Sequence, residues 1–128
     1  MDKISKIIFK SSILFLIIIS LYPGSIFGFL FYGDLEKQPN FITNPFGTSI
    51  NHFVCYFLIS MFGLIIYLKS DKFKKVFYFL LLLSILLEFL QLMVPIRGFE
   101  IYDLFGNILG VVLAYSIVKI YLMLSNHE

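Results

Sequence analysis

The sequence has little charge, a single cysteine and no tryptophan. Charged residues make up 14% of its 128 positions and hydrophobic residues 59%, whereas soluble domains carry about 25% charged residues. This composition excludes an ordinary soluble domain and predicts an integral membrane protein, with residues 1–128 forming one domain. The few lysines flank apolar runs and form no extended basic face, so nucleic acid is not an expected partner.

Several kinds of site are also missing from the sequence. The one cysteine, Cys55, lies inside an apolar run, so no disulfide can form within the chain. There is no G-x-S-x-G motif, no phosphate-binding loop and no H-x-x-x-H spacing. We therefore predict no metal site and no cofactor.

Four apolar segments have the length of about 20 residues that a helix needs to cross the hydrocarbon of a bilayer. The predicted fold is all-α, an integral membrane bundle of four transmembrane helices. The spans are expected at about residues 5–22, 50–68, 76–94 and 102–122, with a polar loop at 33–49. The first span is followed by no small-residue cleavage site, so we interpret it as retained.

Pro23 and Gly24 leave two interpretations of the first span. In one, the span ends at residue 22 and residues 25–32 lie in the membrane interface. In the other, a kinked helix crosses from residue 11 to residue 31. We favour the first interpretation, because a Pro-Gly pair is a strong helix break.

The positive charges predict an orientation. With four spans, both termini and the 69–75 loop share one side, which holds eight of the ten Lys and Arg residues. Cytoplasmic loops are enriched in these residues. Both termini are therefore predicted to be cytoplasmic, and the loops at 33–49 and 95–101 to face outward.

Polar residues interrupt the apolar runs near the outward ends of three spans. They are His52 in the second span, Glu88 and Gln91 in the third, Arg97 in the following loop, and Asp103 and Asn107 in the fourth. Residues three or four apart share a helix face, and lipid offers polar groups no partner. We therefore expect these side chains to meet inside the bundle.

Arg97 is the only arginine, and we expect it to pair with Glu88 or Asp103. Two interpretations stay open for the cluster. It is either a network that only holds the fold together, or a polar pocket open to the outer leaflet in which Arg97 anchors an anion. Gly106 and Gly110 form a G-x-x-x-G pair, which favours helix packing within the chain over contact with a partner helix.

A series of short motifs is similar to the VanZ-like membrane proteins. In order, they are Leu21-Tyr22-Pro23, His52 before an aromatic-rich helix, the pair Glu88 and Gln91, Pro95-Ile96-Arg97, and Asp103 with Asn107 and Gly110. The resemblance covers roughly residues 15–115. One departure is Asn51, where the family usually has lysine, so a second cation that would help to clamp a diphosphate is missing.

The resemblance implies a small multi-pass protein of the bacterial cytoplasmic membrane, whose namesake is associated with low-level teicoplanin resistance. It also implies that the polar cluster is functional. Our leading hypothesis is that His52, Glu88, Gln91, Arg97, Asp103 and Asn107 bind a membrane lipid, a lipid-linked cell-wall precursor or a lipoglycopeptide, and so modulate the cell envelope. One alternative is an intramembrane enzyme for a polyprenyl or lipid substrate, with His52 and Glu88 as acid–base pair and Asp103 as a further catalytic candidate. Another is a structural subunit of a membrane complex.

Overall fold

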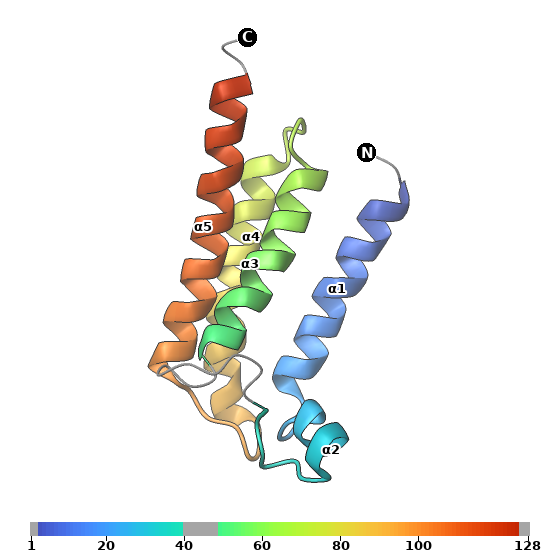
Figure 1. Ribbon diagram of the computed structural model, residues 1–128, viewed down its shortest axis with the longest axis vertical. Helices are drawn as coiled ribbons and strands as arrows, with labels where there is room; N and C mark the ends of the chain where they lie inside the picture. Colours follow the sequence, from blue (N-terminus) through green and yellow to red (C-terminus); the bar gives the residue numbers. More distant parts are fainter. Residues whose placement is uncertain (1–2, 40–48, 126–128) are drawn as a thin grey trace.

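A computed structural model describes residues 3–39 and 49–125 (Figure 1). Its elements are α1 (Lys3–Leu21), α2 (Ile26–Tyr32), α3 (Ser49–Ile66), α4 (Phe73–Leu90), the 3₁₀ turn η1 (Gln91–Met93) and α5 (Ile101–Ser125). No strand occurs in these two described ranges. Four helices are long and apolar enough to cross a membrane, which confirms the predicted all-α fold. The chain is a multi-pass membrane protein.

The long helices run alternately up and down. The start of α1, the turn between α3 and α4, and the last residues of α5 lie at one end of the bundle (Figure 1). The opposite end carries α2, η1 and the connection into α5. Which end faces the cytoplasm stays a prediction from the positive charges.

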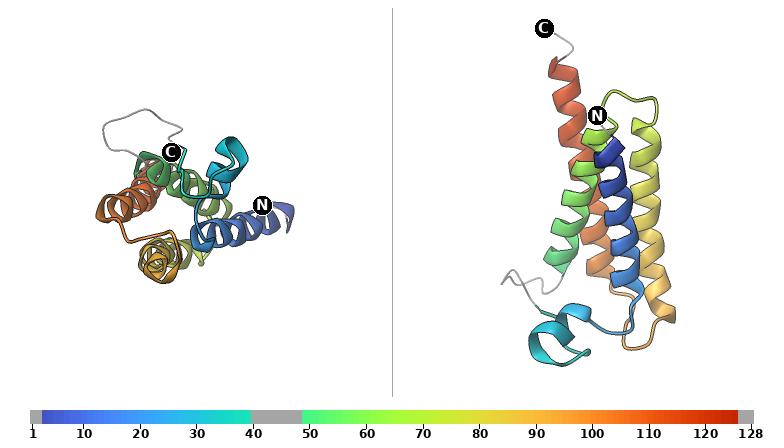
Figure 2. Two further views of the ribbon diagram at one scale, coloured as in Figure 1. Left: turned by 90° about the horizontal axis from the view of Figure 1, so that it is seen from below. Right: turned by 90° about the vertical axis from the view of Figure 1, so that its right-hand side faces the viewer.

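The chain breaks between α1 and α2 at Pro23 and Gly24. Gly24 has a φ of +78°, which L side chains rarely adopt. Ser25 then caps α2, because its Oγ accepts a hydrogen bond from the N–H of Gly28 at 2.9 Å. Figure 2 shows α2 beyond the end of α1, turned away from its axis. The two segments are thus separate helices and form no single kinked span.

Helices α3 and α5 form the closest pair in the bundle. A Cβ added to Gly106 would lie 2.7 Å from the carbonyl oxygen of Ser49, and one added to Gly110 would lie 2.5 Å from that of Phe53. Small residues allow such backbone contact between membrane helices. The G-x-x-x-G face of α5 is therefore covered by α3 of the same chain.

Helix α1 is attached more loosely than the other three. Its buried residues are Phe9, Ile13 and Leu16. The Phe9 ring covers Gly63 of α3, where an added Cβ would lie 2.4 Å from the ring. Seen along the bundle in Figure 2, α1 and α5 lie on opposite sides of α3 and α4. This position of α1 leaves room for the cavities described below.

Candidate functional site

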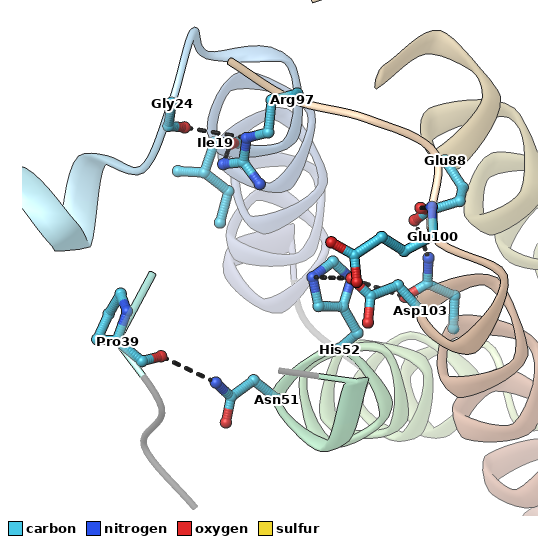
Figure 3. Close-up of polar contacts among 10 residues, drawn as sticks. Ile19, Gly24, Pro39, Asn51, His52, Glu88, Arg97, Glu100 and Asp103 are labelled. Carbon is cyan, nitrogen blue, oxygen red and sulfur yellow. Dashed lines mark hydrogen bonds and ion pairs between the residues drawn. The ribbon is translucent and has the colours of Figure 1, made fainter. Parts of the chain in front are cut away.

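Glu88 lies at the centre of a polar network between α4 and α5. Only 1% of the residue is exposed. Its Oε1 accepts a hydrogen bond from the backbone N–H of Glu100 at 3.1 Å (Figure 3), and its Oε2 accepts one from Nδ2 of Asn107 at 3.1 Å. Both oxygens therefore accept an N–H donor, and neither is left unpaired. Glu88 therefore joins the end of α4 to the start of α5.

His52 extends this network to α3. Its Nδ1 lies 3.2 Å from Oδ1 of Asn107. Because an amide oxygen only accepts, Nδ1 must carry a proton and donate it. On the other side of the ring, Nε2 lies 3.5 Å from Oδ2 of Asp103. His52 is therefore held between two side chains of α5, Asn107 and Asp103.

Asp103 is the least satisfied member of the network. The residue is 4% exposed. Its Oδ1 is buried and has no hydrogen-bond partner among the residues that the structure describes. A buried polar atom without a partner lowers stability by about 1–3 kcal/mol. The network thus contains one carboxylate, Glu88, with both oxygens bonded and a second, Asp103, with one oxygen unpaired.

Arg97 does not form the predicted ion pair with Glu88 or Asp103. Within residues 3–39 and 49–125, the only contact between oppositely charged side chains is that of His52 with Asp103. Instead, the Nε–H of Arg97 donates to the carbonyl oxygen of Gly24 at 2.9 Å, and Nη2 donates to that of Ile19 at 3.1 Å (Figure 3). The last carbonyls of a helix have no partner within it and carry partial negative charge. The guanidinium of Arg97 therefore caps α1.

Burial lowers the pKa of Arg97, and the nearby carboxylates of Glu88 and Asp103 oppose this shift. An arginine stays charged at neutral pH even when its pKa is lowered in this way. A permanent cation therefore lies beside the carbonyls at the end of α1. The sequence pattern did not reveal this contact, because its acceptors are backbone oxygens.

A cavity of about 230 Å³ lies between α1, α2 and α3. Its polar wall includes His52, Gln91 and Arg97 from the predicted site. The other three predicted residues do not line the cavity. Asp103 and Asn107 contact His52, and Glu88 contacts Asn107. The remaining lining residues, which we did not predict as site residues, are Leu16, Ile19, Ser20, Ser25, Ile26, Phe27, Gln38, Pro39, Asn51, Cys55 and Tyr56.

Asn51 is the most informative of the residues that sequence reasoning did not select. Its Nδ2 donates to the carbonyl oxygen of Pro39 at 3.1 Å (Figure 3), while its Oδ1 is buried without a partner in the described part of the chain. Its place beside His52, where a lysine was expected, was the one available signal. Asn51 thus ties the polar loop to α3 and lines the cavity with an uncharged amide.

The arrangement offers binding groups and no metal cage. Within residues 3–39 and 49–125, no group of three or more His, Cys, Asp or Glu side chains could hold a metal ion. The cavity combines one permanent cation, neutral amides and an apolar floor. Such a surface suits a molecule with an anionic part and an apolar part.

Comparison with known proteins identifies a family. The model of the VanZ/LLP1 family matches residues 4–123, which is nearly the whole chain. No curated protein and no solved structure matches it. The match includes α3 and α4, nearly all of α1 and α5, and every residue of the polar network. The chain therefore belongs to the VanZ/LLP1 family.

Proposed function

We propose that this protein binds an anionic amphiphile of the cell envelope in the cavity between α1, α2 and α3. A lipid-linked cell-wall precursor and a lipoglycopeptide both have this chemistry. Binding would modulate the envelope of a bacterial cytoplasmic membrane and thereby its susceptibility to teicoplanin-type glycopeptides.

The observation that carries the proposal is the position of Arg97. Its side chain lines the cavity, and two of its N–H groups bind the carbonyl oxygens of Gly24 and Ile19. The other N–H groups of the guanidinium remain available to an anion, which arginine binds through paired hydrogen bonds. The two contacts also fix the orientation of the guanidinium before a ligand arrives, which lowers the entropy lost on binding.

The geometry favours binding over the enzymatic alternative. Both ring nitrogens of His52 face protein groups, Asn107 and Asp103. Glu88 does not line the cavity, and both of its oxygens accept protein N–H groups. An acid–base pair needs direct access to the proton that it transfers. His52 and Glu88 act better as supports that shape one wall of the site.

The structural-subunit alternative depended on the glycine face of the fourth span. Gly106 and Gly110 already lie against the α3 backbone. A partner helix cannot reach them unless α3 moves away. This contact supports a role in which the chain completes its own bundle.

The test compares the lipids retained by purified wild type, Arg97→Gln and the matched control Lys37→Gln. Lys37 is the other cation at this end of the bundle; its Nζ lies 4.5 Å from the centroid of the Tyr32 ring, and it does not line the cavity. Native mass spectrometry should detect an anionic lipid on wild type and on Lys37→Gln. Its occupancy should fall at least about tenfold in Arg97→Gln.

The same variants are then compared in a host where the wild type alters teicoplanin susceptibility. Arg97→Gln should lose the effect, and Lys37→Gln should keep it. The helical circular dichroism of each variant shows whether it is folded. A folded Arg97→Gln protein that retains the same lipid and the same effect on susceptibility would refute the proposal.

A further inference from the structure

An apolar groove of about 590 Å³ adjoins the polar cavity. It lies between α1 and α3, and four lining residues are common to both spaces: Leu16, Ile19, Phe27 and Cys55. Since the same side chains border the groove and the cavity, the two spaces lie next to each other. No lining residue of the groove carries a charge, so the cation of Arg97 lies at the cavity end only.

The groove has the length of one bilayer leaflet. Its lining residues on α1 extend from Ile7 to Ile19, a distance of about 18 Å at 1.5 Å per residue. Half of a hydrocarbon core of about 30 Å is about 15 Å. A hydrocarbon chain that starts at the polar cavity can therefore follow the groove to about the middle of the membrane.

The side chains of α1 explain why this space stays open. Phe9 packs against α3 near one end of the helix, and Arg97 holds the other end. Between these two attachments the groove is lined by the small residues Ser11 and Ser12, followed by Phe15 and Leu16. The hydroxyl of Ser12 donates to the carbonyl oxygen of Ile8 at 3.0 Å, so its polar group is already paired within the helix.

We infer that the groove holds a hydrocarbon chain of the same molecule whose anionic group binds at Arg97. The inference rests on the proposed function and narrows its ligand to one class, an anionic membrane lipid that enters sideways from the bilayer. The shared border of the two spaces and the single charge at the cavity end support this occupant. A phosphate or glycopeptide without a hydrocarbon chain would fill the polar cavity alone.

Cys55 provides a reporter, because it is the only cysteine and it borders both spaces. The protein is placed in phosphatidylcholine nanodiscs, and the rate of maleimide labelling is measured with dodecyl phosphate, inorganic phosphate or dodecyl maltoside. Dodecyl phosphate should slow labelling of wild type at a lower concentration than inorganic phosphate. Dodecyl maltoside, which has the chain without the charge, should not protect at the same concentration.

Two substitutions separate the groove from the anion site. Ser11→Trp should fill the groove and raise the half-protecting concentration of dodecyl phosphate by at least about fivefold. The matched control Leu14→Trp should leave it unchanged, because Leu14 is exposed and lines neither space. Ile59→Trp, which fills the groove from α3, replaces Ser11→Trp if that variant lacks wild-type helical circular dichroism.

The outcomes distinguish this inference from the proposed function. If Arg97→Gln abolishes protection and the folded groove substitution has no effect, ordinary annular lipid occupies the groove. The inference is then wrong, and the proposed anion site is unaffected. Equal protection by inorganic and dodecyl phosphate would also overturn the inference. If Arg97→Gln leaves protection by dodecyl phosphate unchanged, the proposed function itself fails.

Discussion

The hydrogen bond between Asn107 and Glu88 can be reversed in direction, and this offers a strict test of the polar network. In Glu88→Gln, one carboxylate oxygen becomes an NH₂ group. The native carboxylate accepts from two donors, the Glu100 backbone and Asn107. The new amide can satisfy only one of them, so a buried donor–donor contact replaces a hydrogen bond. We expect the free energy of unfolding to fall by about 2–4 kcal/mol, from one lost charge-assisted bond and one unpaired donor.

The second substitution, Asn107→Asp, should destabilise the protein on its own, because it places a carboxylate against that of Glu88. In the double variant, the new carboxylate at position 107 accepts from the new amide at position 88 and still accepts from Nδ1 of His52. The amide oxygen at position 88 then accepts from the Glu100 N–H. The double variant should therefore be more stable than the sum of the single changes by about 2 kcal/mol or more.

The measurement is equilibrium unfolding in mixed micelles with increasing sodium dodecyl sulfate, followed by helical circular dichroism. The control for a general loss of stability is Val112→Ala. Val112 lies in α5, as Asn107 does, but is 38% exposed. Wild-type stability of Glu88→Gln would show that the carboxylate is not ionised. A coupling energy of zero in the double variant would refute the donor and acceptor assignment.

Three further predictions concern the rest of the fold. Gly110→Ala should lower stability by about 1–3 kcal/mol in the same unfolding assay, because its Cβ meets the α3 backbone, whereas Gly98→Ala, with nothing within 4 Å of the new atom, should not. Ile96→Gly should raise stability by about 0.5–1 kcal/mol, since Ile96 has a φ of +64° that strains a β-branched residue; a loss of stability would contradict this account. In a cysteine-free background, Asp34→Cys should react with a membrane-impermeant maleimide on intact cells and Lys72→Cys should not. The reverse result would invert the predicted orientation.

The long helices were predictable because the length of an apolar run alone predicts a membrane span. Helical spacing was enough to predict that the polar side chains would meet at one end of the bundle. The structure brings Glu88 and Asn107 together as these rules suggest. The partners of Arg97 were not predictable. Its acceptors are the carbonyl oxygens of Ile19 and Gly24, which every residue possesses and no side-chain pattern marks.

The sequence also did not show which of the predicted residues line the cavity and which lie outside it. Nothing in the spacing separates His52, which lines the cavity, from Asp103 behind it. That separation depends on where α1 lies, and α1 is positioned by Phe9 against Gly63 and by the Arg97 contact. Both are long-range contacts, so a reading of local patterns cannot supply them.

The cap on α1 also orders events during synthesis. Ile19 and Arg97 are 78 positions apart, so α1 leaves the ribosome long before its capping side chain does. A nascent chain that ends before Arg97 can insert its first three spans, yet it lacks the group that fixes α1 and charges the cavity. The cavity that Arg97 lines is therefore complete only when the loop before α5 has emerged from the ribosome. Any chain that ends before Arg97 would therefore lack the cation of the proposed anion site.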